Sequence, residues 1–387
     1  MAAGVVFCGV WIPGVNRFDP TTWHAQARAE AFFMTPELRG GWQRGAVDHR
    51  PWHYSEIARW MAEPGHFDVL LLHLAPPDEQ GRCSLSIAAD FTPIVLQALR
   101  DGAAVLAHVN PRLPRTNGPS VAVADITAWV QADLPLLEHD AAGAMADPAL
   151  QALARQVAQQ VRDGDTLQFG LGRLQAAVLA ELAAVRGHGG LRVHSGMVSD
   201  GLLGLHQAGA LAAAGAPGPP VTTGVALGSA RLYAAMADRD LVRFAPVSHT
   251  HDAAVLAALP RLLSINSALQ VDLLGQVNAE MLDGQQVSGA GGLVDFVRGA
   301  RSSPQGRSVI AINATAGRDR RSRIVPRLPA GAVSVSRADV DLVSTDHGTA
   351  ALRHLGVDAR ARALIGLAAP EHRADLEQAW HTLRRSL

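Results

Sequence analysis

Residues 264–300, SINSALQVDLLGQVNAEMLDGQQVSGAGGLVDFVRGA, carry the most information about the architecture of this chain. Polar and apolar residues alternate in the first part, and the period of a β-strand would bring several of its polar residues toward one face of a sheet: Asn266, Gln270, Asp272, Gln276, Asn278 and Glu280. The run GAGG that follows lets backbone amides approach a ligand and can cradle a phosphate or an oxyanion. A tight turn from strand to helix explains the same glycines more simply.

Short apolar runs on the N-terminal side of this stretch alternate with helical patterns. The runs at 4–12, 67–75 and 103–110 are bounded by Gly, Pro or Asp and are typical of buried strands. Residues 90–102 have helical spacing, with Thr92 able to cap the helix and Pro93 at its first position. This alternation predicts an α/β fold with mainly parallel sheets.

A change of pattern near residue 145 predicts two tandem α/β domains, 1–145 and 146–387. Residues 138–172 read as a linker, an amphipathic helix, a turn, a strand and a glycine turn, which is how a second α/β unit would begin. Residues 363–383 predict a closing pair of helices. Tandem α/β domains place an active site in the cleft between them or at the carboxyl ends of their strands.

Composition excludes several function classes. The formal net charge of −1 over 387 residues gives no general attraction to nucleic acid or to an anionic membrane surface. The chain contains no lysine, which excludes a Schiff base or a P-loop lysine. The two cysteines, Cys8 and Cys83, are far apart and fit a reducing compartment, so we expect a cytoplasmic protein. No apolar run is long enough to predict a membrane span.

At several places the sequence resembles the acetyl-CoA hydrolase/transferase family, especially its 4-hydroxybutyrate CoA-transferase-like branch. The resemblance covers nearly the whole chain and runs through these stretches: VWIPGVNRFD (10–19), FDVLLLHLAPPDEQGRCSLSIAADF (67–91), VNPRLPR (109–115), HSGMVSDG (194–201), GSARLY (228–233), INSALQVDLLGQVNAE (265–280), QVSGAGGLVDFVRGA (286–300), SRIVPRL (322–328), DVDLVSTDHGTAALR (339–353) and RARALIGLAAPEHR (360–373). It implies two CoA-transferase-type α/β domains. It also implies coenzyme A as a substrate rather than a permanently bound cofactor, with acyl-CoA and small carboxylic acids as partners.

The resemblance further implies covalent catalysis. A glutamate of such enzymes attacks the acyl-CoA thioester, and the resulting protein thioester passes CoA to a second acid without loss of the thioester energy. Residues 242–252, VRFAPVSHTHD, match the family stretch that carries this glutamate, but Arg243 or, in a neighbouring placement, Ser248 takes its position. The nucleophile that defines the transferase reaction is therefore absent from its expected place.

Three functions remain open. Another acid such as Asp252 or Glu280 could be the nucleophile of a CoA-transferase. His249 or His251 could instead be the general base of an acyl-CoA hydrolase, because histidine titrates near neutral pH. The protein could also bind acyl-CoA without turnover. A metal site built on the two histidines and Asp252 is the weaker idea, because nothing else in the chain has metal-ligand spacing.

The remaining site predictions also follow from the resemblance. Asp346 in TDHG matches an active-site acid of the family, although a structural turn explains it too. The expected substrate- and CoA-binding residues are Ser248, Asn266, Gln276, Asn278, Gly289, Gly291, Gly292 and Arg298.

The chain opens almost at its first match to the family, which predicts a shortened first domain and a homodimer or a subunit of a larger assembly.

Overall fold

The computed structural model describes residues 4–139, 147–185, 189–213, 218–329 and 331–387. The chain forms two compact units that are each assembled from separate segments. Unit 1 comprises residues 1–57, 267–294 and 310–387, and unit 2 comprises residues 58–266 and 295–309. The predicted domain boundary between residues 145 and 146 lies outside the described residues.

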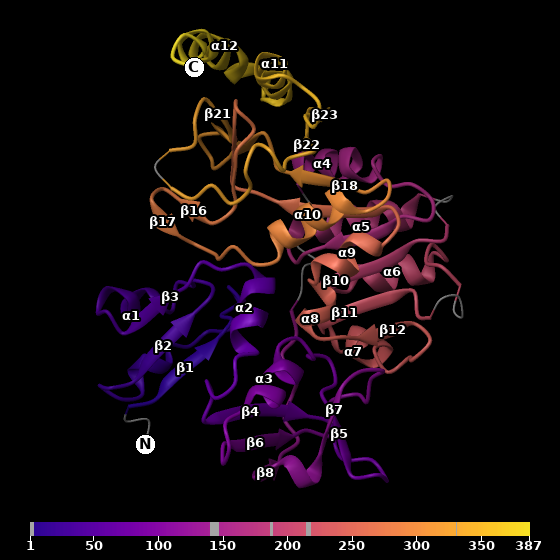
Figure 1. Ribbon diagram of the computed structural model, residues 1–387. Helices are drawn as coiled ribbons and strands as arrows, with labels where there is room; N and C mark the ends of the chain where they lie inside the picture. The colour runs from indigo at the N-terminus through magenta and orange to yellow at the C-terminus, as the bar shows by residue number, and fades with distance from the viewer. Residues whose placement is uncertain (1–3, 140–146, 186–188, 214–217, 330) are drawn as a thin grey trace. The chain divides into compact units, whose positions relative to one another are not determined.

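The main sheet of unit 2 is parallel, with neighbouring strands in the order β12-β11-β10-β9-β13. Figure 1 labels β10, β11 and β12 of this sheet. All four residues of β9 are buried, as expected for a central strand of a parallel sheet that is covered on both faces. The strands and helices of this part are β9 (Thr166–Phe169), β10 (Arg192–Val198), β11 (Val221–Ala226), β12 (Val242–Phe244), β13 (Leu262–Ser267), α4 (Pro148–Ala158), α5 (Arg173–Ala184), α6 (Gly201–Gln207), α7 (Ala230–Ala235), α8 (Val247–Thr250) and α9 (Ala253–Ala258).

Helix α4 shows how local sequence fixes an element of this layer. Asp147 accepts the backbone N–H groups of Ala149 and Leu150, and Pro148 occupies the first turn, where its missing N–H costs nothing. Apolar residues recur every three or four positions and are buried: Leu150, Leu153, Ala154 and Val157. The amphipathic helix predicted in this stretch is confirmed.

A smaller parallel sheet, β4-β6-β8, precedes this layer within unit 2. One face packs into a core that includes Leu72, Leu74 and Val105. The opposite face carries exposed apolar side chains, with Leu71 at 69% and Val130 at 61% exposure. The elements are β4 (Val69–Leu74), β5 (Arg82–Ser84), α3 (Thr92–Ala98), β6 (Ala104–Val109), β7 (Ser120–Ala122), η2 (Val123–Asp125) and β8 (Ala128–Gln131).

Unit 1 contains a parallel three-stranded sheet, β1-β2-β3, and a second small sheet, β15-β14-β21. Antiparallel pairs β16–β17, β19–β20 and β22–β23 and two closing helices complete it. Its elements are β1 (Val6–Gly9), η1 (Pro20–Thr22), β2 (Arg28–Ala31), α1 (Arg39–Gln43), β3 (Val47–His49), β14 (Gln270–Asp272), β15 (Val277–Asn278), β16 (Met281–Leu282), β17 (Gln285–Gln286), β19 (Thr315–Ala316), β20 (Arg321–Ser322), β21 (Ile324–Val325), β22 (Leu342–Thr345), β23 (Gly348–Ala351), α11 (Val357–Leu367) and α12 (Pro370–Arg384). The chain passes between the units within or at the ends of α2 (Tyr54–Met61), β13, α10 (Leu293–Ser302) and β18 (Arg307–Ala311).

The structure confirms the mixed α/β class with mainly parallel sheets, and it corrects two local predictions. Helix α3 begins one residue earlier than predicted, because Phe91 holds the cap position and Thr92 is already helical. The stretch 266–280 is not one continuous strand, because the chain turns back between β14 and β15, yet the paired residues Gln270 and Asn278 bond to each other at 3.3 Å on one face of this sheet, as predicted. The Asp272 Oδ1 accepts the N–H groups of Leu274 and Gln276 and closes that turn.

Candidate active site

Residues 242–252 fold as a strand end followed by two short helices of unit 2. Pro246 holds the cap position of α8, and Asp252 caps α9 by accepting the Val255 N–H at 2.9 Å. The Asp252 carboxylate therefore has a role in the local fold. Ser248 lies exposed on α8.

Three histidines gather beside α8. His194 on β10 donates its Nε2–H to the Thr250 carbonyl at 3.1 Å, and its ring centroid lies 5.7 Å from that of His249. A hydrogen bond of 2.9 Å joins the Thr250 Oγ1 to the His251 Nδ1, and the His251 ring contacts Phe296 with centroids 4.7 Å apart. The sequence paired His249 with His251, whereas the fold adds His194 from a distant strand.

Burial keeps these histidines neutral. It lowers the pKa of His251 to about 3, with the neighbouring His194 as a second cause, and lowers the pKa of His194 to about 4. The pKa of the half-buried His249 is also lowered, first by burial and then by the Arg243 guanidinium. An imidazole whose conjugate acid has a pKa of about 3 is a weak base, so His251 is poorly suited to activate water at neutral pH.

Two glycines in adjacent strands make room for this cluster. Gly196 of β10 and Gly224 of β11 stand at matching positions, between the paired residues Ser195↔Thr223 and Met197↔Val225. A Cβ on Gly196 would lie 2.6 Å from the His251 Cε1. A Cβ on Gly224 would lie 3.0 Å from the Gly196 carbonyl oxygen and 3.1 Å from the Asp90 Oδ1. The missing side chains of this pair, here called the glycine window, leave the space that the His251 imidazole and the Asp90 carboxyl group occupy.

Asp90, which the sequence did not single out, contributes that carboxyl group. Burial raises its pKa from 3.8 to about 7. The residue as a whole is partly exposed, but its Oδ1 is buried and has no hydrogen-bond partner in the described part of the chain. At neutral pH both forms of the carboxyl group are populated.

Arg243, at the position where the resemblance expects the glutamate, projects from β12 as an exposed side chain. Its charge reaches the cluster, because it lowers the pKa of both His194 and His249. No hydrogen bond or ion pair of its guanidinium occurs among the described residues. It is available to an anionic group of a substrate.

The glycine loop belongs to unit 1, where it packs against the chain itself. A Cβ on Gly289 would lie 2.2 Å from the Phe32 carbonyl oxygen, and Gly291 has a φ of +57°. The Gly291 carbonyl accepts the Tyr54 N–H at 3.1 Å, and Gly292 follows directly before α10. Close backbone packing therefore explains Gly289, and left-handed backbone explains Gly291.

Most of the other predicted binding residues form hydrogen bonds with neighbouring residues of their own unit. In unit 2, Asn266 bonds to Gln168 and Ser264, and Arg298 lies exposed on α10. In unit 1, the Gln276 amide donates to Asp272, and the Asn278 Oδ1 accepts the N–H groups of Glu280 and Met281. The Asp346 Oδ1 accepts the Ala314 N–H at 2.7 Å, as a structural turn would require. Glu280 is buried beside Gln286.

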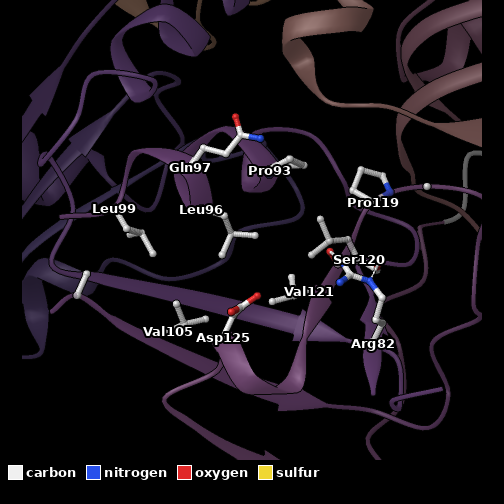
Figure 2. A pocket seen from close by; sticks show the side chains of 13 residues that line it. Arg82, Pro93, Leu96, Gln97, Leu99, Val105, Pro119, Ser120, Val121 and Asp125 are labelled. Carbon is white, nitrogen blue, oxygen red and sulfur yellow. Dashed lines mark hydrogen bonds between the residues drawn. The ribbon is translucent and has the colours of Figure 1, made fainter. Parts of the chain in front are cut away.

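Unit 2 also contains a hollow of about 730 Å³ (Figure 2). Apolar side chains from α3, β6 and β7 line much of it, and its charged lining residues are Arg82 and Asp125. Arg82 is held by two hydrogen bonds of 2.7 Å to Ser120. The hollow shares no lining residue with the histidine cluster, although its Gly118 packs on Phe244 of β12. The size of the hollow suits a small molecule. The titratable groups described above, the three histidines and Asp90, lie outside the hollow.

No group of three or more His, Cys, Asp or Glu is placed to hold a metal ion in the described residues. None of the described helices has the length and apolar character needed to cross a membrane.

The sequence is similar to known proteins over most of its length. Residues 228–380 match the profile of the acetyl-CoA hydrolase/transferase C-terminal domain. The chain is 36% identical over 359 residues to the 4-hydroxybutyrate coenzyme A transferase of Clostridium kluyveri, spanning 90% of this chain and 81% of that protein. The chain belongs to the acetyl-CoA hydrolase/transferase family.

Solved structures agree with this family assignment. The 4-hydroxybutyrate CoA-transferase of Porphyromonas gingivalis superposes with a TM-score of 0.78 at 27% identity, covering 100% of this chain and 94% of that one. RipA from Yersinia pestis gives a TM-score of 0.87 at 26% identity, covering 99% and 95% of the two chains. The predicted family and the CoA-transferase fold are both confirmed.

Arg243→Gln is expected to raise the pKa of His249, because it removes a positive charge that disfavours the imidazolium. NMR titration of the histidine ring protons measures the change. The matched control is Arg231→Gln on α7, since Arg231 is not among the groups that shift this pKa. An unchanged His249 titration in the Arg243 variant would contradict the described position of this guanidinium.

Gly196→Ala is expected to lower the free energy of unfolding by about 1–3 kcal/mol, because the added methyl group overlaps the buried His251 ring. Gly204→Ala in α6 is the control: its Cβ would meet the nearest atom at 3.4 Å, and alanine favours a helix. Denaturant unfolding compares the two. Equal midpoints for Gly196→Ala and the unmodified protein would refute the tight packing.

Proposed function

We propose that this protein is an acyl-CoA:carboxylate CoA-transferase acting on a short-chain acyl-CoA. The observation that carries the proposal is the 36% identity to a 4-hydroxybutyrate coenzyme A transferase across 90% of this chain and 81% of that protein. Another relative, 31% identical, is a butyryl-CoA:acetate CoA-transferase of Anaerostipes caccae. Coenzyme A is then a substrate that enters and leaves, and the second substrate is a small carboxylic acid.

The histidine cluster supports this assignment through its electrostatics. Neutral, buried His194 and His251 add no charge beside Asp90 and the glycine window. The free guanidinium of Arg243 offers a bidentate partner to the carboxylate of an incoming acid. A polar but largely uncharged cluster with one exposed cation beside it suits an anionic acid and a neutral thioester.

Hydrolysis of acyl-CoA is the second candidate, and Arg243 is the observation that favours it. An arginine cannot form the protein thioester that conserves CoA for a second acid. Water would then be the acceptor, and His249 would be the base, because its pKa is lowered less by burial than that of the fully buried His251. The same residue also favours CoA binding without turnover.

We further propose a cytoplasmic homodimer. Cys8 and Cys83 are both free thiols, which fits a reducing compartment. The exposed face of sheet β4-β6-β8 carries Leu71, Leu106 and Val130, and a second copy offers the same apolar surface. Analytical ultracentrifugation tests this: a purely monomeric protein at micromolar concentration would refute the dimer.

Product analysis by mass tests the function. The purified protein is incubated with short acyl-CoAs, with and without acetate or 4-hydroxybutyrate. A new acyl-CoA that forms only when an acid is added is the expected result. Free CoA released without any added acid would show that the reaction is hydrolysis and not transfer. Unchanged acyl-CoA under all conditions would leave binding without turnover as the function.

A further inference from the structure

The hollow of Figure 2 combines an apolar lining with charged residues of both signs. Leu85, Val105 and Val121 line it, are at most 5% exposed and belong to the core of sheet β4-β6-β8. Leu96 of α3 and Leu99 directly after the helix are partly buried and pack against the same core. A hydrocarbon group that enters the hollow therefore contacts close-packed aliphatic side chains and leaves water.

Arg82 is held at this hollow in a fixed orientation. Its Nε donates to the Ser120 hydroxyl and its Nη2 to the Ser120 carbonyl, both at 2.7 Å (Figure 2). Asp78, which accepts the Arg82 backbone N–H, pairs with Arg115 at 2.8 Å and not with the Arg82 guanidinium. The Arg82 Nη1 has no hydrogen bond or ion pair among the described residues. An oriented guanidinium loses little freedom on binding, so Nη1 is prepared to donate to an anionic oxygen.

Asp125 supplies the opposite charge close by. Strands β5 and β7 pair so that Arg82 lies opposite Ala122, and Asp125 ends the turn η2 that follows β7 directly. The Val123 N–H donates to the Gly81 carbonyl at 2.9 Å, which fixes the start of this turn beside Arg82. Three residues of a 3-10 helix rise by about 6 Å, so the two charged residues line the hollow from neighbouring positions. The exposed Asp125 carboxylate makes no hydrogen bond or ion pair in the described part of the chain.

The two charges do not pair with each other. No ion pair joins Arg82 and Asp125 among the described residues, and Figure 2 shows the two side chains on either side of Val121. A purely anionic ligand would be attracted by the guanidinium and repelled by the carboxylate, and a purely cationic ligand would meet the reverse. A ligand with one group of each sign satisfies both side chains, and its hydrocarbon part fits the apolar lining.

We propose that this hollow binds a free α-amino acid with a large apolar side chain. The α-carboxylate accepts from the Arg82 Nη1, the α-ammonium donates to the Asp125 carboxylate, and the side chain packs on Leu96, Val105 and Val121. An α-amino acid carries both charged groups on one carbon, which matches two charged residues at neighbouring positions. A volume of about 730 Å³ has room for an aromatic side chain. The inference does not rest on the proposed function, because the hollow shares no lining residue with the histidine cluster.

NMR titration of the full-length protein with three related compounds tests the proposal. L-Phenylalanine is compared with 3-phenylpropanoate, which lacks the ammonium group, and with 2-phenylethylamine, which lacks the carboxylate. Phenylalanine is expected to bind about tenfold more tightly than either compound, because only phenylalanine satisfies both charged side chains. Equal or tighter binding of 3-phenylpropanoate or 2-phenylethylamine, or no binding of phenylalanine at millimolar concentrations, would refute the amino-acid site.

Two variants separate the contributions of the charges. Asp125→Asn should weaken phenylalanine binding about tenfold and strengthen 3-phenylpropanoate binding, because it removes a repulsion between carboxylates. Arg82→Gln should weaken the binding of both compounds. The control is Arg231→Gln on α7, an exposed arginine outside the hollow, which should bind like the unmodified protein. Unchanged phenylalanine affinity in Asp125→Asn, whose carboxylate has no partner to lose, would contradict the proposal even if Arg82→Gln failed to fold.

Discussion

Replacing Arg307 with alanine is expected to lower the free energy of unfolding by about 3–5 kcal/mol, because it leaves a buried carboxylate unpaired. The Arg307 Nη2 lies 2.5 Å from the Asp165 Oδ2, and the two side chains are 14% and 0% exposed. The same oxygen accepts the Arg162 N–H at 2.7 Å, and the Arg307 Nη1 donates to the Gln160 carbonyl. These contacts connect strand β18 to the turn before β9.

Two further variants test whether burial of the ion pair causes the loss of stability in Arg307→Ala. Arg155 and Glu181 lie 4.0 Å apart with side chains 55% and 28% exposed, so Arg155→Ala should change stability by less than about 1 kcal/mol. Asp165→Leu combined with Arg307→Met should destabilise less than Arg307→Ala alone, since no charge remains buried. Chemical unfolding measures all three. If Arg307→Ala and Arg155→Ala had equal effects, the pair would not be a buried ion pair in solution.

Acidification from pH 6.5 to 5 is expected to cost roughly 2 kcal/mol of stability through the groups around the glycine window. His194 and His251 have folded-state pKa values of about 4 and about 3, below their ordinary 6.5, so in this range they bind protons only when unfolded. Asp90 has a folded-state pKa of about 7 against an ordinary 3.8, so it binds its proton only when folded. Two protons in the unfolded state against one in the folded state give a slope of about 1.4 kcal/mol per pH unit.

Asp90→Asn should therefore steepen this pH dependence. Without the compensating carboxyl group, the slope of stability on pH should rise to about 2.7 kcal/mol per unit between pH 6.5 and 5. Unfolding by denaturant at several pH values gives both slopes. An Asp90→Asn slope equal to or shallower than that of the unmodified protein would mean that Asp90 is not protonated in the folded state.

Much of the fold could be predicted because buried parallel strands and amphipathic helices leave strong local patterns. The run at 67–75 contains β4, and Asp147–Pro148 begin α4 as cap and first residue. The turn at Asp272 was missed because alternating residues fit a continuous strand equally well until the backbone bonds to that carboxylate are known.

The site was less predictable because its parts come from distant segments. The sequence pointed to His249 and His251, which are close in the chain, but gave no reason to connect them with His194 or Asp90. One signal was present: Gly196 and Gly224 interrupt strand sequences, and a glycine inside a strand often marks a close approach of another group. Which group approaches depends on the tertiary fold.

Oxygen-18 tracing most directly tests the proposed CoA transfer through a carboxyl group of the protein. The protein is incubated with a short acyl-CoA and acetate labelled at both carboxyl oxygens. When the second acid leaves as its CoA thioester, one of its oxygens stays on the protein carboxyl group. We predict that transfer places the label in one carboxyl-bearing peptide of the protein. Transfer that continues while every peptide stays unlabelled would contradict the account.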